Sequence, residues 1–162
     1  TIKGFEPLYI QRIAQLTNKS NQFNLTTLRC SEDDIRAMAQ NENALCLCGR
    51  LVDKFGDNGI VTVVAGRQQG DVLDLTLWLM SCRVLKRGME DAMMDTVVAE
   101  AAARGVKTIV GHYYPTAKNA MVREFYAQYD FAKTAEDADG NTEWTLDVAA
   151  YTPKHPHMKI ER

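Results

Sequence analysis

The pattern of apolar and polar positions changes its period within residues 72–103, which predicts a strand followed by a helix. From Val72 to Met80, leucines alternate with other residues, and a period of two sends neighbouring side chains to opposite faces of a strand. The expected core face of this strand consists of Leu73, Leu75, Leu77 and Leu79. After Gly88 the apolar residues recur at helical spacing, at Met89, Ala92, Met93, Val97 and Ala101. Gly105 stands where a helix C-cap glycine is expected.

Upstream of this unit, the pattern predicts two helices and a hairpin. One helix begins at Pro7, because proline suits the first helical turn, and the other follows Ser31, because serine with acids behind it forms an N-cap. The predicted segments are an extended Thr1–Phe5, a helix over Pro7–Leu16, a polar loop over Thr17–Asn24, a helix after Ser31, and strands over Leu45–Val52 and Ile60–Ala65 joined by a turn at 53–59.

Downstream, the pattern predicts a strand, a helix and a final hairpin. Pro115–Thr116 starts the helix, and its apolar positions are Val122, Phe125 and Tyr129. The other predicted segments are a strand over Val106–Tyr114, a strand from Phe131, a turn at Ala138–Asn141, and a strand containing Trp144, Leu146 and Val148. The tail from Tyr151 has no periodicity and is expected on the surface.

This order of elements indicates one α/β domain with a mixed sheet. Short hairpins in the first half favour antiparallel strands, whereas the strand–helix–strand step around Gly88 requires a crossover and therefore parallel strands. We expect a single domain over residues 1–150 and a C-terminal surface tail over 151–162.

Composition narrows the function classes. The chain has 162 residues, 46% apolar and 25% charged, with a formal net charge of −2, which is typical of an ordinary globular domain. We see no basic stripe for nucleic acid and no apolar run long enough for a membrane span. Cys30, Cys46, Cys48 and Cys82 form no zinc-binding pattern with histidine, so we expect buried, reduced thiols, no metal and a cytoplasmic location.

The turn between the central strand and helix is a candidate phosphate site. A strand that runs through a glycine turn into a helix directs free amide N–H groups and the positive end of the helix dipole to one point. Arg83, Lys86 and Arg87 add positive charge there. Many strand–helix turns contain a glycine and bind nothing, so this alternative stays open.

The element order and two motifs resemble the GNAT fold of the N-acetyltransferase superfamily. The segment Arg83–Gly88 is similar to the coenzyme A signature Q/R-x-x-G-x-G/A. Asn119, Phe125–Tyr126 and Asp130–Phe131 resemble the family's N-x5-[LF]-Y-x3-G-F stretch, with aspartate in place of its glycine. The resemblance implies a mixed, mostly antiparallel central sheet of about seven strands flanked by about four helices.

A narrower resemblance connects the chain to the C-terminal GNAT-like domain of FkbH-like proteins, which belong to the HAD superfamily, subfamily IIIC. It rests on Arg12–Thr27 (RIAQLTNKSNQFNLTT), Ser81–Leu85 and Pro115–Asn119. In that family an upstream phosphatase-like domain loads acyl groups onto an acyl carrier protein. The resemblance therefore implies a HAD-type domain and an acyl carrier protein as partners, and no phosphatase chemistry in this chain.

The resemblance also implies a cofactor site. Acetyl-CoA or another acyl-CoA would contact Cys82, Arg83, Val84, Lys86, Arg87, Gly88, Met89, Asn119 and Tyr126. Lys86 replaces the first glycine of the signature and places a side chain where backbone should approach pyrophosphate. Whether coenzyme A itself binds is therefore left open by the sequence.

Acyl transfer needs a base for the acceptor, hydrogen-bond donors for the carbonyl oxygen, and an acid for the leaving thiolate. The resemblance implies that Asp74 is the base, that Tyr126 is the acid, and that a main-chain amide near 82–84 polarises the thioester. Alternatively, Asp74 is an exposed strand acid, Tyr126 packs beside Phe125, and Asn119 braces the helix start.

The remaining candidate residues are a second possible base and several charges. His112 is an alternative base, although a single strand histidine is more often structural. Lys118 and Arg123 could hold a distal phosphate or lie solvated on a helix. His155 and His157 flank a proline in the tail, and we expect no catalytic role for them.

Three functional hypotheses remain. The first is an acyltransferase that moves an acyl group from a coenzyme A or carrier-protein phosphopantetheine thioester to an amine or hydroxyl. The second is a non-catalytic module that binds an acyl carrier protein or its phosphopantetheine arm for an upstream domain. The third is a structural or dimerisation domain with a decayed cleft.

Overall fold

The computed structural model describes residues 2–53, 56–81, 84 and 88–154. Its helices are η1 (Pro7–Tyr9), α1 (Ile10–Lys19), α2 (Glu32–Gln40), α3 (Met89–Ala103), η3 (Ala120–Val122), η4 (Tyr126–Tyr129) and η5 (Val148–Ala150), where η denotes a 3-10 helix. Its strands are β1 (Ile2–Lys3), β2 (Ala44–Asp53), β3 (Gly56–Gln69), β4 (Val72–Met80), β5 (Thr108–Tyr113), β6 (Ala132–Glu136) and β7 (Thr142–Asp147).

The strands form one mixed sheet that is mostly antiparallel. It has seven strands in the order β1-β2-β3-β4-β5-β7-β6. Only the β4–β5 pair is parallel among the described pairings, and α3 is the crossover between these two strands. The predicted mixed sheet and its parallel step are confirmed.

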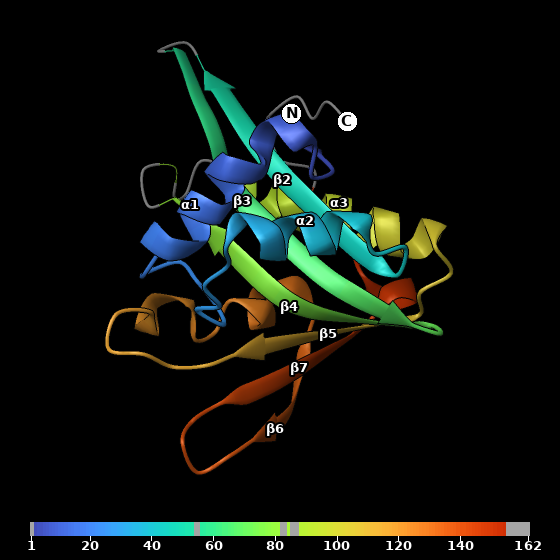
Figure 1. Ribbon diagram of the computed structural model, residues 1–162. Helices are drawn as coiled ribbons and strands as arrows, with labels where there is room; N and C mark the ends of the chain where they lie inside the picture. The colour runs from blue at the N-terminus through green and yellow to red at the C-terminus, as the bar shows by residue number, and fades with distance from the viewer. Residues whose placement is uncertain (1, 54–55, 82–83, 85–87, 155–162) are drawn as a thin grey trace.

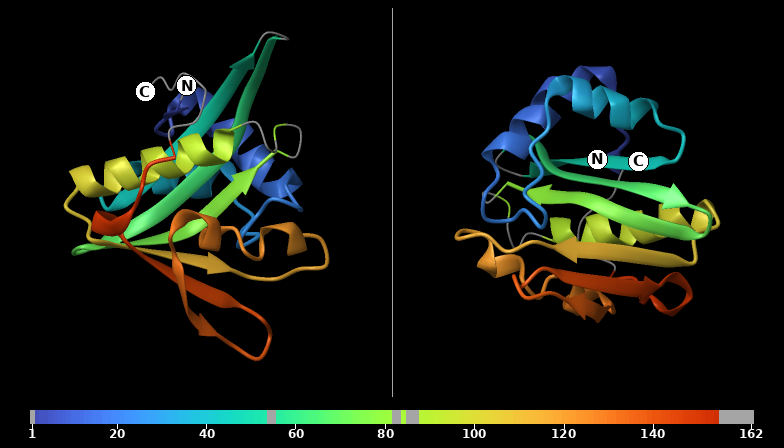
Figure 2. Two further views of the ribbon diagram at one scale, coloured as in Figure 1. Left: turned by 180° about the vertical axis from the view of Figure 1, so that it is seen from behind. Right: turned by 60° about the horizontal axis from the view of Figure 1, so that its bottom comes forward.

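Helices cover both faces of the sheet (Figures 1 and 2). On one face, α1 and α2 enclose a core that contains Ile13, Ile35 and Leu77. On the other face, α3 and the segment with η3 and η4 enclose a larger core that includes Met93 and Tyr126. We call these the α1/α2 face and the α3 face. No helix in the described ranges has both the length and the apolarity for a membrane crossing.

The helix predicted after Ser31 is confirmed, with a complete capping box. The Ser31 hydroxyl accepts a hydrogen bond from the Asp34 amide at 3.1 Å, and the Asp34 carboxylate accepts one from the Ser31 amide at 2.8 Å. The first helix is longer than predicted and ends at Lys19. The reason is that Thr17 and Asn18, which we expected in a loop, both donate hydrogen bonds to the carbonyl of Ala14.

The prediction that four leucines of β4 share one face is wrong. Leu73 and Leu75 lie in the core of the α3 face, whereas Leu77 and Leu79 lie in the core of the α1/α2 face. The pairing with β3 steps from Gly66↔Leu75 to Ala65↔Leu77, so Thr76 is an extra residue on β4. Such a β-bulge reverses the side-chain alternation. A Cβ on Gly66 would lie 2.8 Å from the carbonyl oxygen of Asp74, so glycine permits this close approach.

The helix predicted after Pro115–Thr116 is not continuous. Two short 3-10 helices, η3 and η4, take its place, and Val122, Phe125 and Tyr129 still face the core. The segment ends at Asp130, which adopts a left-handed φ of 71°. This conformation favours glycine, which explains why the resembling motif has glycine at the position of Asp130.

Two other boundaries differ from prediction. Strands β2 and β3 extend through most of the predicted turn at 53–59, and positive φ angles at Gly56 and Gly59 occur inside β3. At the C-terminus, the first residues of the predicted surface tail are attached to α3. The Tyr151 hydroxyl donates a hydrogen bond to Asp95 at 2.5 Å, and the Lys154 amide donates one at 2.9 Å.

Candidate functional site

The predicted phosphate turn is described only at its edges. Cys82, Arg83, Lys86 and Arg87 lie outside the described residues, whereas Val84 is fully buried. Gly88 is the N-cap of α3 with a left-handed φ of 85°, and as a glycine it has no side chain to cap this helix. The first amide N–H groups of α3 therefore receive no hydrogen bond from the N-cap residue, and such N–H groups can bind an anion.

The Met89 side chain packs into the core and away from any ligand. It is 2% exposed, and a Cβ on Gly49 would overlap its terminal methyl. Only the main chain of Met89 is therefore available for the cofactor contact that the resemblance implies.

Strands β4 and β5 part after a short parallel stretch. Their pairing ends at Asp74↔Val110, although β4 continues to Met80. The segment Phe23–Leu25 bridges the opening. The Leu25 amide donates to the Trp78 carbonyl at 3.0 Å, the Met80 amide donates to the Phe23 carbonyl at 3.0 Å, and the Tyr114 amide donates to the Leu25 carbonyl at 2.8 Å. The edge of β4 that faces the opening is thus already hydrogen-bonded at these positions.

A carboxylate–imidazole pair lies where the strands part. The Asp74 Oδ1 atom is 2.5 Å from His112 Nε2, and both side chains project from the α1/α2 face, opposite Leu73 and Gly111 in the strand alternation. Because a carboxylate only accepts hydrogen bonds, Nε2 carries the hydrogen and Nδ1 is left as an acceptor. Nδ1 has no hydrogen-bond partner among the described residues. The His112 side chain is 19% exposed and that of Asp74 is 50% exposed, so solvent or a substrate can reach the pair.

Tyr126 of η4 packs against β5 on the α3 face, opposite the Asp74–His112 pair. A Cβ on Gly111 would lie 2.4 Å from Tyr126 Cζ, so the missing side chain of Gly111 makes room for the phenol ring. The ring is 2% exposed. Burial, and to a lesser extent the negative charge of Asp74, raise the pKa of the Tyr126 hydroxyl well above its usual range. The hydroxyl therefore stays protonated and can donate a hydrogen bond.

Near Tyr126, the indole N–H of Trp78 is buried and has no hydrogen-bond acceptor among the described residues. Trp78 is 1% exposed. Its ring is 6.4 Å from that of Tyr126 in an edge-to-face arrangement. An unpaired buried donor is destabilising, and a ligand acceptor beside Tyr126 would satisfy it.

Asn119 is fully engaged by the protein. It is 0% exposed, and its side-chain nitrogen donates to the carbonyls of Asn24 and Tyr114, each at 2.9 Å. Its oxygen accepts from the Thr116 amide at 2.8 Å and from the Tyr113 hydroxyl at 3.2 Å. The side-chain amide therefore connects the bridging segment to the end of β5, a role different from bracing a helix start, and its donors and acceptor positions are all used by the protein.

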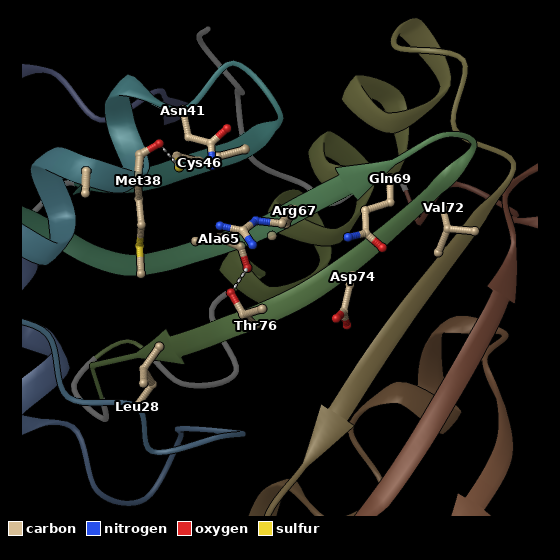
Figure 3. Close-up of a pocket in the computed structure, with 13 residues that line it drawn as sticks. Leu28, Met38, Asn41, Cys46, Ala65, Arg67, Gln69, Val72, Asp74 and Thr76 are labelled. Atoms are coloured by element: carbon tan, nitrogen blue, oxygen red, sulfur yellow. Dashed lines mark hydrogen bonds between the residues drawn. The ribbon is translucent and has the colours of Figure 1, made fainter.

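Two grooves are lined by residues that flank the bridging segment and by residues of β4 or its end. The acceptor groove, as we name it, has a volume of about 560 Å³ and is lined by residues that include Leu28, Met38, Arg67 and Asp74 (Figure 3). The basic groove has a volume of about 850 Å³ and lies beside Ser81 at the end of β4. Its cationic side chains are Arg12, Lys19 and Lys118. Both grooves have the size of small-molecule sites.

The described residues contain no group of three or more histidine, cysteine or acidic side chains that could hold a metal ion. Burial raises the pKa of Cys46 to about 11 and that of Cys48 to about 12. These thiols are therefore poor ligands and poor nucleophiles near neutral pH.

Solved structures with the same fold are acetyltransferases. The ribosomal-protein-S18-alanine N-acetyltransferase from Escherichia coli is 16% identical, with a TM-score of 0.68, over 91% of this chain and 93% of that chain. Aminoglycoside 6'-acetyltransferase type Ii is 16% identical, with a TM-score of 0.67, over 91% and 97% of the two chains. Spermidine N-acetyltransferase from Vibrio cholerae, in complex with CoA and spermine, is 9% identical, with a TM-score of 0.67, over 92% and 95%.

These comparisons show the fold alone, which is the GNAT fold that is also named for the matching GNAT domain of S. lividans PAT. The sequence comparisons add nothing to this, since no protein-family model matches the chain and no curated protein sequence is significantly similar. Identities at this level establish a fold and leave the reaction to be argued from the site.

Sequence reasoning placed Asp74 and Tyr126 near the central turn, but it treated His112 as a subordinate candidate. The parallel pairing Asp74↔Val110 places His112, two residues further along β5, on the same face as Asp74. Placing the two predicted parallel strands side by side in the sequence could have predicted this pair. Trp78 and Arg67 were missed. The bulge at Thr76 decides where Trp78 lies, and no periodicity predicts it.

Proposed function

We propose that this domain transfers an acyl group from a phosphopantetheine thioester, carried by coenzyme A or by a carrier protein, to an amine or hydroxyl acceptor. The observation that supports the proposal most is the 2.5 Å contact between Asp74 and His112 at the place where β4 and β5 part. A base held by a carboxylate, next to an opening between strands, is what deprotonation of an acceptor requires.

His112 is the proposed general base and Asp74 its positioning residue. The free Nδ1 atom of His112 takes the proton that the acceptor loses as its nitrogen or oxygen bonds to the acyl carbon. Asp74 fixes the tautomer and stabilises the imidazolium that results. This assigns Asp74 a different role from the direct base that the resemblance implies.

Donors on the opposite face complete the proposed site. A pantetheine thioester supplies an activated acyl carbonyl and a thiolate leaving group. The Tyr126 hydroxyl and the Trp78 indole are the donors for these atoms, and the raised pKa of Tyr126 makes it a hydrogen-bond donor that keeps its proton. The departing thiolate then gains its proton from solvent, and His112 returns its proton to solvent.

The acyl donor, a phosphopantetheine thioester, is proposed to enter through the basic groove. A phosphorylated arm is anionic, and the cations Arg12, Lys19 and Lys118 line this groove beside the end of β4. The amides at the start of α3 provide a second anion site. The Trp78 carbonyl and the Met80 amide are already hydrogen-bonded to Leu25 and Phe23, so they cannot pair with the amides of pantetheine. The acyl donor must therefore bind beside this edge of β4 or displace the segment Phe23–Leu25.

A second function, a non-catalytic module for a carrier protein, is favoured by that same bridging segment. A domain that needs only to hold a phosphopantetheine arm does not need a free β4 edge. The resemblance to FkbH-like proteins supports an acyl carrier protein and an upstream HAD-type domain as the partners, in either function. The replacement of a signature glycine by Lys86 favours a carrier-borne arm over free coenzyme A.

Calorimetric titration and product analysis separate the two functions. The chain is titrated with acetyl-CoA and coenzyme A, as is the variant Lys86→Gly, and release of coenzyme A from acetyl-CoA is followed by chromatography with a panel of primary amines. Binding with amine-dependent release supports the acyltransferase. Binding without release, when amines and alcohols are offered with acetyl-CoA and with an acetylated phosphopantetheinyl carrier protein, contradicts it and leaves the binding module.

A further inference from the structure

The acceptor groove contains a cation that is not neutralised by the neighbouring acid. Arg67 on β3 pairs directly with Asp74 on β4, and Asp74 pairs in turn with Val110 on β5. These three positions form one row across the sheet. Side chains at directly paired positions project from the same face, so Arg67 and Asp74 share the α1/α2 face.

Asp74 is directed to His112 and does not pair with Arg67. Its Oδ1 atom contacts His112 Nε2, and Figure 3 shows the Arg67 side chain pointing along the groove and away from Asp74. No carboxylate in the described part of the chain lies within ion-pair distance of the Arg67 guanidinium. Its hydrogen-bond donors are therefore available to a ligand.

The rest of the groove is mostly apolar. Arg67 and Asp74 are its charged lining residues, and Leu28, Ala37, Met38 and Ala65 line it as well. The groove thus has a positive group, an apolar wall and, at Asp74, the carboxylate that contacts the proposed base. A planar guanidinium binds a carboxylate through two parallel hydrogen bonds, whereas a phosphate dianion would be left with a net charge by one arginine.

We propose that the acceptor is an amine or alcohol that also bears a carboxylate, and that Arg67 is the residue that selects this carboxylate. This inference rests on the proposed function, which assigns the amine or hydroxyl group of the acceptor its role as the nucleophile. The acceptor presents its nucleophile to His112, and its carboxylate binds Arg67 in the groove.

The row geometry limits the length of the acceptor. Arg67 and the strand of His112 are two strand spacings apart, roughly 10 Å between backbones. Because the Arg67 side chain points away from Asp74, it does not shorten this distance, so a spacer of about six bonds or more between nucleophile and carboxylate fits. The α-amino group of an amino acid is too close to its own carboxylate, whereas an ω-amino acid has the required separation.

Binding of three matched probes tests the inference without turnover. The probes are 6-aminohexanoate, hexylamine and β-alanine, titrated into the whole chain with and without coenzyme A and followed by amide chemical shifts. We expect 6-aminohexanoate to bind about tenfold or more tightly than hexylamine and to shift amides of Cys46 and Thr76, which line the groove. β-Alanine, which is too short, binds no better than hexylamine.

Variants of Arg67 decide the assignment. Arg67→Gln removes the preference for 6-aminohexanoate, Arg67→Lys retains part of it, and Lys107→Gln, an exposed control with the same change of charge, leaves it unchanged. Equal binding of 6-aminohexanoate and hexylamine to the unaltered chain, or a preference that survives Arg67→Gln, overturns the inference.

The two proposals fail in different ways. If the preference depends on Arg67 but no amine releases coenzyme A from acetyl-CoA, the groove binds a carboxylate and the acyltransferase proposal is wrong. If release occurs but the rates with hexylamine and 6-aminohexanoate are equal, the acyltransferase stands and the role of Arg67 is wrong.

Discussion

His112 Nε2 lies 2.5 Å from the carboxylate of Asp74, although the two residues are separated by a strand, a crossover helix and a second strand. The contact depends on the parallel pairing of β4 and β5, which ends at the row of Asp74. Past that row the strands part, and the segment Phe23–Leu25 bridges them. The remaining donors, Tyr126 and Trp78, belong to the core of the α3 face. The carboxylate–imidazole pair and these two aromatic side chains thus lie on opposite faces of the sheet.

Replacing Asp74 by asparagine tests its positioning role. Asparagine presents either an amide donor or a carbonyl to His112 and no longer stabilises an imidazolium. We expect Asp74→Asn to slow coenzyme A release by about 10- to 100-fold and to leave coenzyme A binding unchanged, measured by steady-state rates and calorimetry. Asp71→Asn, an exposed acid at the start of the same strand, is the matched control and should behave as the unaltered chain. Equal rates for the two variants would show that the Asp74 carboxylate has no part in the reaction.

The close approach of Gly111 to Tyr126 predicts a strong effect of one methyl group. Because a Cβ at Gly111 would lie 2.4 Å from the ring, Gly111→Ala forces the ring to move. We expect a loss of about 1–3 kcal/mol in the free energy of unfolding, measured by urea denaturation. The double variant Gly111→Ala with Tyr126→Ala should lose less than the sum of the single effects. Additive losses would mean that the alanine does not press on this ring.

The brace at Asn119 predicts a loss of stability. Asn119→Ala leaves the buried carbonyls of Asn24 and Tyr114 without the hydrogen bonds that they now receive. Each unsatisfied buried group costs about 1–3 kcal/mol, so thermal unfolding should occur several degrees lower. Asn43→Ala, at an exposed position, is the control. A variant that lost coenzyme A binding at unchanged stability would instead assign Asn119 to the cofactor.

The thiols predict a pH-dependent reactivity. Burial raises the pKa of Cys46 to about 11 and that of Cys48 to about 12, so in the folded chain little thiolate forms at pH 8. Alkylation by iodoacetamide, located by mass spectrometry, should be slow at both residues at pH 8, should accelerate as pH rises towards 11, and should be fast in urea. The folded state holds these protons more tightly than the unfolded state, so stability should fall as pH rises above about 8.5, the ordinary thiol pKa. Rapid alkylation of the folded chain at pH 8 would contradict the burial of these thiols.

The parts of the fold that follow from local chemistry could be predicted. The N-cap at Ser31, the hairpin strands, the crossover helix and the parallel pairing all arise from residue type and periodicity over short stretches. The bulge at Thr76 could not, because it depends on how Gly66 fits against the Asp74 carbonyl of the neighbouring strand. The segment 120–129 keeps its apolar spacing but forms 3-10 helices, and its core contacts are compatible with either helix type.

The candidate site was predictable only in part for the same reason. Asp74 and Tyr126 were named because a strand pattern and a motif mark them, and their roles remain predictions. The partner of Asp74 is set by strand order and register, which bring together residues distant in the sequence. Asn119 was also marked by a motif, but its four hydrogen bonds to the protein became visible only when the bridging segment was placed between the strands.

The rate of coenzyme A release by His112→Gln tests the central claim most directly. Glutamine retains a hydrogen-bonding side chain for Asp74 but cannot accept a proton from the acceptor. With acetyl-CoA and an amine that the unaltered chain acetylates, we expect about a 100-fold or greater loss of rate at unchanged coenzyme A affinity. A rate within about twofold of the unaltered chain, far below the loss expected for a general base, would contradict the assignment of His112.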